Sequence, residues 1–113
     1  MQVVKTGIDI CQISRIKKLL DKPSFLQRVF TAAELEDKRP EHLAALFAAK
    51  EAFFKATQIK LQKLNEIEIK KDKNARPYLS FNPKNLKFKI SSCDLSLSHD
   101  GDCAVACVVI LAE

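Results

Sequence analysis

The sequence lacks several features that would assign it to a common class of protein. It has no tryptophan, one tyrosine and only two glycines. No apolar run approaches the roughly 20 residues that a membrane span needs, which excludes a transmembrane helix. The four cysteines form no Cys-x-x-Cys pair, which argues against a zinc ribbon or dithiol motif and favours buried reduced thiols. Residues 1–9 lack the charged-then-apolar order of a secretory signal, so we expect a cytoplasmic protein.

The residues that are present suffice for one small domain. The chain has 113 residues, of which 47% are hydrophobic, and such a chain can build a modest core without metal or disulfide support. We therefore expect a single domain over residues 1–113. The net charge of +5 suits a polyanionic partner: a nucleic acid, a phosphate-rich cofactor or an acidic protein.

The order of hydrophobic patterns predicts an α+β fold, with an N-terminal strand and helices packed on an antiparallel sheet. Thr31 and Glu34 have capping-box spacing, which predicts a short helix that starts there. The other expected helices cover residues 12–21, 23–30 and 40–58. The expected strands cover residues 2–11, 65–72, 76–81, 86–90 and the two sides of a turn at 100–101.

The helix expected over residues 40–58 contains the stretch "LAALFAAKEAFFKA", which carries three charges among apolar residues. At about 100° per residue, a strip roughly 60° wide contains Ala44, Ala48, Glu51 and Lys55. An acid and a base on a strip of alanines can face a cleft, because small side chains let a ligand or another backbone come close. The alternative is a common exposed Glu-Lys pair, worth a few tenths of a kcal/mol.

Two further polar residues stand in positions that need an explanation. Asp9 lies between isoleucines in the first strand, where an ionised carboxylate is rarely buried without a cation or several donors. Asp9 therefore requires a partner. His99 ends a strand directly before a tight turn, where its ring can reach the edge of a cleft, although a histidine at a turn is more often an ordinary surface residue.

The stretches "TGIDICQISRI", "LAALFAAKEAFFKA" and "LSLSHD" occur in this order along the chain. Together with "RVFTAAEL", "EIEI" and "ARPYL", they resemble the holo-[acyl-carrier-protein] synthase group of 4'-phosphopantetheinyl transferases over nearly the whole chain. The resemblance implies transfer of the phosphopantetheine arm of coenzyme A to a serine of an apo acyl carrier protein, in fatty acid biosynthesis. It also implies release of adenosine 3',5'-bisphosphate and a requirement for Mg²⁺.

The resemblance assigns roles to five residues. Asp9 and Glu51 match the metal-binding acids of the family, and Mg²⁺ typically takes one or two carboxylates with substrate phosphates and water. Lys55 matches a lysine placed to bind phosphate and to stabilise charge on the departing bisphosphate. Ser98 and His99 are expected in the coenzyme A pocket. The resemblance leaves Glu51 or a metal-held water as the general base.

The resemblance also suggests a reason for the alanines of the long helix. The coenzyme is expected to pass over Ala44 and Ala48, on the side of Glu51 and Lys55. Lys50 lies nearly 100° around the helix from Glu51 and is therefore the weaker candidate for a ligand contact.

Three basic residues, Arg15, Lys17 and Lys18, follow Asp9 on the first helix. In the family this helix docks the acidic helix of the carrier protein, so the resemblance implies that these cations form a docking face. The alternative is an ordinary solvated surface. Short members of the family are commonly homotrimers with sites shared between chains, and the apolar final strand "AVACVVIL" agrees with an oligomer.

The chain departs from the family pattern at several positions. Gln12 stands where glutamate is usual, and Leu46 replaces an arginine that many members carry, which removes a candidate phosphate contact. "KATQI" lacks the glycine that commonly follows "KA", and Ala75 replaces a glycine before the basic residue and proline of the hairpin. These changes leave open how the 3'-phosphate of coenzyme A is held.

Two other functions fit part of the pattern. A nucleic-acid-binding module would explain the net charge, but it would leave Asp9 and Glu51 without a reason, and the low aromatic content provides no stacking platform. A catalytically inactive scaffold of the same fold would not need Asp9, Glu51, Lys55 and His99 to be intact, as they are. The expected partners therefore include no nucleic acid and no membrane.

Overall fold

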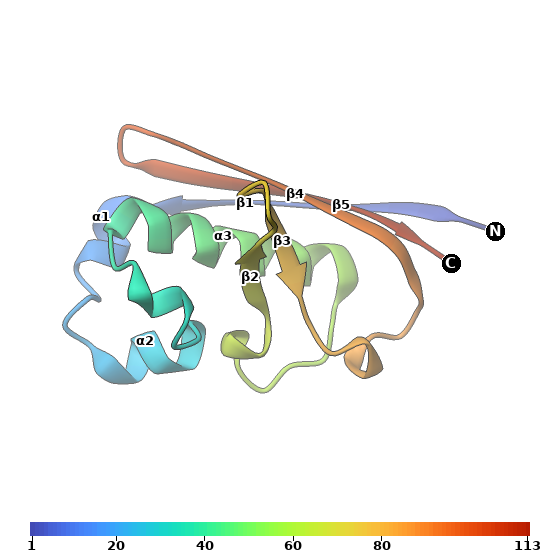
Figure 1. The fold of residues 1–113 in the computed structure, drawn as a ribbon, viewed down its shortest axis with the longest axis horizontal. Coiled ribbons are helices and arrows are strands. Elements are labelled where there is room, and N and C mark those ends of the chain that lie inside the picture. Colours follow the sequence, from blue (N-terminus) through green and yellow to red (C-terminus); the bar gives the residue numbers. More distant parts are fainter.

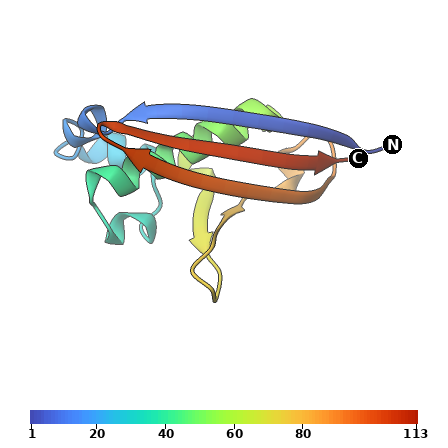
Figure 2. The same cartoon turned by 90° about the horizontal axis from the view of Figure 1, so that it is seen from above.

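The computed structural model describes all residues from Met1 to Glu113 and shows a sheet covered on one face by helices (Figure 1). The sheet is antiparallel with the strand order β1-β5-β4. Its strands are β1 (Val3–Gln12), β4 (Ile90–Asp100) and β5 (Cys103–Ala112). The long helix α3 (Pro40–Thr57) packs against one face of the sheet. Figure 2 shows the opposite face uncovered.

The smaller elements lie on the α3 side of the sheet (Figure 1). Helices α1 (Ile13–Lys17) and α2 (Pro23–Val29) lie at one end, and β2 (Glu68–Lys71) pairs with β3 (Pro77–Ser80) in a separate hairpin. Three short 3₁₀ turns cover Glu34–Glu36, Leu64–Glu66 and Pro83–Asn85. No helix is both long enough and apolar enough to cross a membrane. The predicted α+β class is confirmed.

Close packing of α3 on the sheet depends on small residues. Ala44, Ala48 and Ala52 are completely buried, and a Cβ added to Gly7 of β1 would stand 1.8 Å from the carbonyl oxygen of Ala52. Any side chain at residue 7 would therefore force the strand and the helix apart. The expectation that the coenzyme passes over Ala44 and Ala48 is wrong, because both side chains are enclosed in the core.

The uncovered face of the sheet is apolar along β1 and β5. Side chains alternate between the two faces of a strand, and Val4, Ile8 and Ile10 point away from α3 with 64%, 63% and 64% of their surface exposed. The register places Ile8 opposite Cys107 and Ile10 opposite Val105. A single chain therefore exposes a continuous apolar strip on this face.

One predicted strand is wrong. Of residues 86–90, only Ile90 belongs to a strand, where it begins β4. The alternation of Leu86 and Phe88 arises because both side chains pack against the core, although no neighbouring strand pairs with their backbone. All four cysteines are unpaired as expected, but only Cys11 is fully buried.

The capping box that the sequence predicts is present. Thr31 Oγ1 accepts a hydrogen bond from the Glu34 backbone N–H at 3.2 Å, and Glu34 Oε1 accepts one from the Thr31 N–H at 2.8 Å. The helix that follows is a single 3₁₀ turn.

One residue in each stretch that lacks an expected glycine adopts the backbone conformation that glycine favours. Gln58, which ends α3 within "KATQI", has φ of 53°, and Ala75 has φ of 62°. The left-handed conformation costs about 1–2 kcal/mol for a residue with a Cβ. The turns are therefore retained at some expense of stability.

Candidate active site

Strand β1 and helix α3 bring together the residues predicted to bind metal and phosphate. The Lys55 ammonium donates hydrogen bonds to Asp9 Oδ1 at 2.9 Å and to the Ile8 carbonyl oxygen at 3.0 Å. Glu51 lies one turn before Lys55 on the same side of α3. Asp9 thus has the cationic partner that its position in a strand requires.

The electrostatics of this group favour a bound cation. The pKa of Glu51 is raised above its ordinary value, first by burial and next by the Asp9 carboxylate, whereas Lys55 and Arg15 act in the opposite direction. Two neighbouring carboxylates repel each other, and a cation that both contact removes this repulsion. No cluster of three His, Cys, Asp or Glu side chains suited to a metal is present. Two carboxylates fit Mg²⁺, which commonly takes its other ligands from phosphates and water.

Lys55 retains a hydrogen-bond donor for a ligand. Its side chain is 54% exposed, whereas that of Asp9 is 17% exposed. An ammonium group carries three donors, of which Asp9 and the Ile8 carbonyl use two. The third donor can meet a phosphate that enters from solvent.

Lys50 points into the core, away from this group. Its ammonium lies 2.6 Å from Glu34 Oε1, 2.6 Å from the Val29 carbonyl oxygen and 5.4 Å from the centre of the Phe30 ring. Glu34 Oε2 also accepts a hydrogen bond from the Ile69 N–H at 2.7 Å. Lys50 therefore ties α3 to the segment after α2 and to strand β2, and it is not a ligand-binding group.

Ser98 and His99 lie apart from Asp9, Glu51 and Lys55. They line a cleft of about 720 Å³ that the start of α3, the end of β4 and the β2–β3 hairpin enclose. His42 of α3 also lines it, and nine residues separate His42 from Glu51, which is about 180° around a helix. The cleft and the carboxylates thus lie on opposite sides of α3, and one chain does not bring all five predicted residues together.

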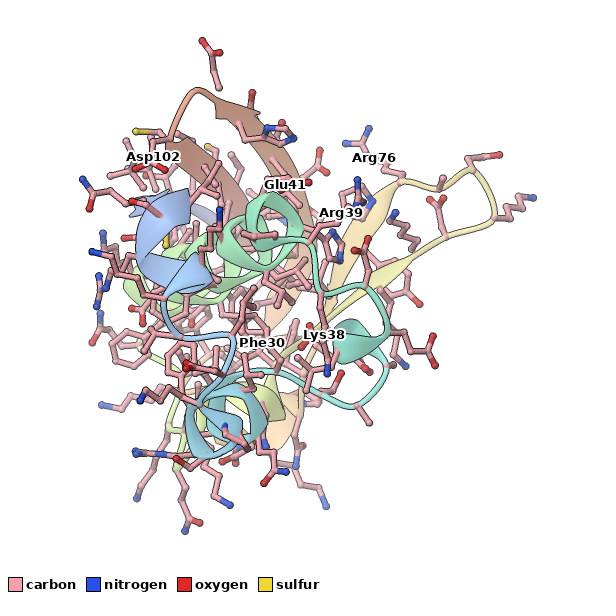
Figure 3. The ribbon with its side chains drawn as sticks, turned by 90° about the vertical axis from the view of Figure 1, so that its left-hand side faces the viewer. Phe30, Lys38, Arg39, Glu41, Arg76 and Asp102 are labelled. Carbon is pink, nitrogen blue, oxygen red and sulfur yellow. The ribbon has the colours of Figure 1, made fainter.

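The cleft contains residues that the sequence analysis missed. Arg39 and His42 line it together with Leu46, and Figure 3 shows Arg39 and Glu41 where α3 begins. Arg39 Nε and Nη2 donate to the Asp37 carboxylate at 3.0 and 2.7 Å, which holds the pKa of Asp37 well below its usual range. Burial lowers the pKa of His42. The sequence could have predicted that these residues share a surface, because Arg39, His42 and Leu46 follow the i, i+3, i+7 spacing of one helix face.

The three predicted docking residues are exposed on and directly after α1. Arg15 lies close enough to Glu51 to oppose the rise of its pKa. Of the three basic residues, Arg15 is therefore the one that lies near the carboxylates.

Comparisons with known proteins place the chain in one family. The sequence pattern of the 4'-phosphopantetheinyl transferase superfamily matches residues 5–108. The holo-[acyl-carrier-protein] synthase of Nautilia profundicola is 40% identical over 111 residues, which cover 93% of this chain and 97% of the relative. That of Sulfurovum sp. is 39% identical over 114 residues, which cover 95% and 96%.

Solved structures extend the likeness to the fold. The Helicobacter pylori holo-[acyl-carrier-protein] synthase in complex with coenzyme A superposes with a TM-score of 0.80 at 32% identity, covering 93% of this chain and 98% of that one. The Bacillus anthracis synthase in complex with CoA (3',5'-ADP) gives a TM-score of 0.80 at 31% identity, covering 100% of both chains.

Proposed function

This chain belongs to the 4'-phosphopantetheinyl transferase superfamily, and we infer the reaction from this membership together with the geometry of the candidate site. The relatives that it matches over nearly their whole length are holo-[acyl-carrier-protein] synthases. We propose that the protein transfers the 4'-phosphopantetheine arm of coenzyme A to a serine of an apo acyl carrier protein and releases adenosine 3',5'-bisphosphate. The observation that carries this proposal is the meeting of Asp9, Glu51 and Lys55 at the surface between β1 and α3.

Asp9 and Glu51 are the proposed ligands of Mg²⁺. When bound, Mg²⁺ would supply charge neutralisation on the pyrophosphate of coenzyme A. Burial and, next, repulsion from Asp9 raise the pKa of Glu51, and the assignment is supported because a shared cation relieves this repulsion.

Lys55 is the proposed phosphate-binding group. Its free donor lies beside the two carboxylates, so it can contact the phosphate that remains on the departing bisphosphate. Its hydrogen bond to Asp9 holds the ammonium at this position before substrate arrives. Its role is therefore to orient the pyrophosphate and to stabilise the charge that develops on the leaving group.

The serine hydroxyl must lose a proton during the transfer. Glu51 is the proposed acceptor, directly or through a water that it positions, because its carboxylate lies beside the proposed phosphate-binding group Lys55.

Coenzyme A has a second phosphorylated region, the ribose 3'-phosphate and adenine, for which we propose the cleft of Ser98 and His99. Because α3 separates this cleft from Asp9 and Glu51, a coenzyme that contacts both has to lie between two chains. The apolar outer face of the sheet, with Ile8 and Ile10 exposed, is suited to cover by further copies. These features support a homotrimer with shared sites, in which residues 1–113 form one domain.

The acidic carrier protein is proposed to dock on Arg15, Lys17 and Lys18. Arg15 of this surface lies near Glu51, so a serine on a docked carrier would lie near the pyrophosphate. Charge complementarity of this kind accelerates association and fixes orientation.

Intact-protein mass spectrometry tests the proposed reaction. Purified protein, coenzyme A, Mg²⁺ and a bacterial apo acyl carrier protein should yield a carrier heavier by one phosphopantetheine arm. A carrier whose target serine is alanine should not change, and a chelator should stop the reaction. Absence of any mass shift with several carriers in the presence of Mg²⁺ would contradict the proposal.

A further inference from the structure

Helix α1 has no N-terminal cap of its own. It contains only five residues, Ile13–Lys17, its first turn has no acidic residue, and the side chain of Gln12 makes no capping hydrogen bond. A helix this short does not persist without outside support. Its position on the protein must therefore be held by contacts from elsewhere in the chain.

Asp102, in the turn between β4 and β5, supplies the missing cap. Its Oδ1 accepts a hydrogen bond from the Ser14 N–H at 2.8 Å, and its Oδ2 accepts one from the Ser14 hydroxyl at 2.6 Å. The Asp102 carbonyl oxygen accepts a third from the Ile13 N–H at 2.8 Å. The bonds from Ser14 lower the pKa of Asp102 below its ordinary value. Figure 3 shows Asp102 beside α1.

The cap lies directly beside the basic residues of α1. Arg15 directly follows Ser14 and is near enough to Glu51 and Cys11 to lower the pKa of each. Lys18, which follows the last residue of α1, acts in the same way on Asp102 itself. If the N-terminal turn of α1 loosened, these cations would lose their fixed places relative to Glu51.

We propose that Asp102 is a positioning residue for carrier recognition: it fixes α1 so that Arg15, Lys17 and Lys18 present one preformed surface to the acidic carrier. The inference rests on the proposed function, because it presumes that this surface receives the carrier. It assigns to the β4–β5 turn a part in binding a partner that the turn itself does not contact.

Because Asp102 is negatively charged, its two possible roles predict opposite changes in carrier binding when the side chain is removed. As a plain surface charge, an aspartate beside an acidic partner repels it, so removal of the carboxylate would improve binding. As a cap, Asp102 organises the cations, so loss of the cap would weaken binding. Asparagine keeps a capping oxygen but not the charge, whereas alanine keeps neither.

The experiment measures KM for the apo carrier and for coenzyme A at low salt in Asp102→Ala, Asp102→Asn and Ser14→Ala. Asp102→Ala should raise the carrier KM about fivefold, the effect of losing one cap, and Ser14→Ala, which keeps the backbone N–H bond to Asp102, should raise it by less. The KM for coenzyme A should stay unchanged, and Asp102→Asn should remain near the wild type. The double variant Ser14→Ala/Asp102→Ala should add little, because both substitutions break the same contact.

Asp100→Ala is the matched control, since it removes the same charge from the same turn region at an exposed residue with no side-chain hydrogen bond. It should leave the carrier KM unchanged or slightly lower. A carrier KM that falls or stays constant in Asp102→Ala would overturn the proposal.

Amide hydrogen exchange provides a readout that does not depend on catalysis. The Ser14 amide should exchange faster in Asp102→Ala than in the wild type and should stay protected in Asp102→Asn. Equal protection in all three proteins would also overturn the inference. Failure of the wild-type protein to modify any carrier would instead refute the proposed function, which is a different result from equal KM values among active variants.

Discussion

Helix α3 carries two lysines that form ion pairs in opposite environments. The side chains of Lys50 and Glu34 are 0% and 1% exposed, whereas those of Lys55 and Asp9 are 54% and 17% exposed. The buried pair is enclosed, because Lys50 also bonds the Val29 carbonyl and Glu34 also receives backbone N–H groups. Each lysine makes two hydrogen bonds, but only the third donor of the exposed Lys55 can be reached by a ligand from solvent.

The two lysine–carboxylate ion pairs of α3 therefore have different roles. A fully buried ion pair cannot be reached by a ligand, and its energetic importance appears when one partner is removed. An exposed pair contributes little to stability, but its groups remain free to exchange partners. Residues 50 and 55 therefore belong to the architecture and to the proposed chemistry, respectively.

The largest expected effect comes from breaking the buried pair. Lys50→Met leaves the Glu34 carboxylate buried without its cation and should lower the free energy of unfolding by about 3–5 kcal/mol. Lys55→Met, the same substitution on the same helix, should lower it by less than about 1 kcal/mol. Urea unfolding followed by circular dichroism measures both. Similar losses in the two variants would show that burial does not distinguish the pairs.

The next effect comes from removing the carboxylates of the open group. Asp9→Ala and Glu51→Ala should each lower the rate of carrier modification at limiting Mg²⁺ by at least about 100-fold, because each removes a proposed metal ligand. The fold should survive, since neither side chain belongs to the core. Initial rates measured with circular dichroism as a folding control test this. Near-normal rates in either variant would refute the assigned site.

A smaller effect is expected at the edge of the open group. Reversal of charge in Arg15→Glu/Lys18→Glu should raise the carrier KM about tenfold and leave the coenzyme A KM nearly unchanged. Salt should weaken carrier binding by the wild type more than by the variant, because exposed charges are screened over about 8 Å at physiological ionic strength.

The control for this charge reversal is Lys73→Glu/Lys84→Glu, which changes the net charge equally at exposed positions away from α1. It should leave the carrier KM near the wild-type value. An equal rise in both double variants would indicate a net-charge effect and not a docking face.

The smallest expected effect is a gain in stability, whereas Lys50→Met was expected to lose stability. Because the folded-state pKa of Glu51 is raised, its protonated form contributes stability below an unfolded pKa near 4.5, and this contribution is lost as pH rises through the folded pKa. Glu51→Gln should therefore stabilise the metal-free protein near neutral pH, by at most about 1 kcal/mol after solvent screening. The gain should disappear in acid.

Thermal unfolding in a chelator across this pH range provides the measurement, with Glu34→Gln as the comparison. Glu34→Gln weakens the buried pair and should destabilise the protein. Destabilisation by Glu51→Gln at neutral pH would mean that Lys55 and Arg15 outweigh burial and Asp9 at this site.

The meeting of Asp9 with Glu51 and Lys55 was predicted by the resemblance to the family, and two local patterns agreed with it. Helical spacing places Glu51 and Lys55 on one side of α3 and turns Lys50 away, and an acid inside a strand demands a cation. The partner of Lys50 could not be read in this way. Glu34 reaches it across 16 positions, through a contact that depends on how α2 and the following turn pack.

The error at residues 86–90 has a different cause. Alternation of Leu86 and Phe88 reports which side chains are buried, but a strand also needs a neighbouring backbone with free donors and acceptors. The sequence also could not predict that His99 lies apart from Glu51, because this depends on the side of α3 on which each strand of the sheet lies. Sequence order contains no such information.

Gly7 bears on which metal ion the proposed site prefers. The absence of its Cβ lets β1 approach the Ala52 carbonyl, and this contact stands two residues from Asp9 on the strand and one residue from Glu51 on the helix. This contact thus sets how closely the backbone that carries Asp9 approaches the backbone that carries Glu51. Magnesium binds oxygen at about 2.0–2.1 Å and calcium at about 2.3–2.6 Å, so a wider gap at residue 7 would shift the preference of the site toward the larger ion.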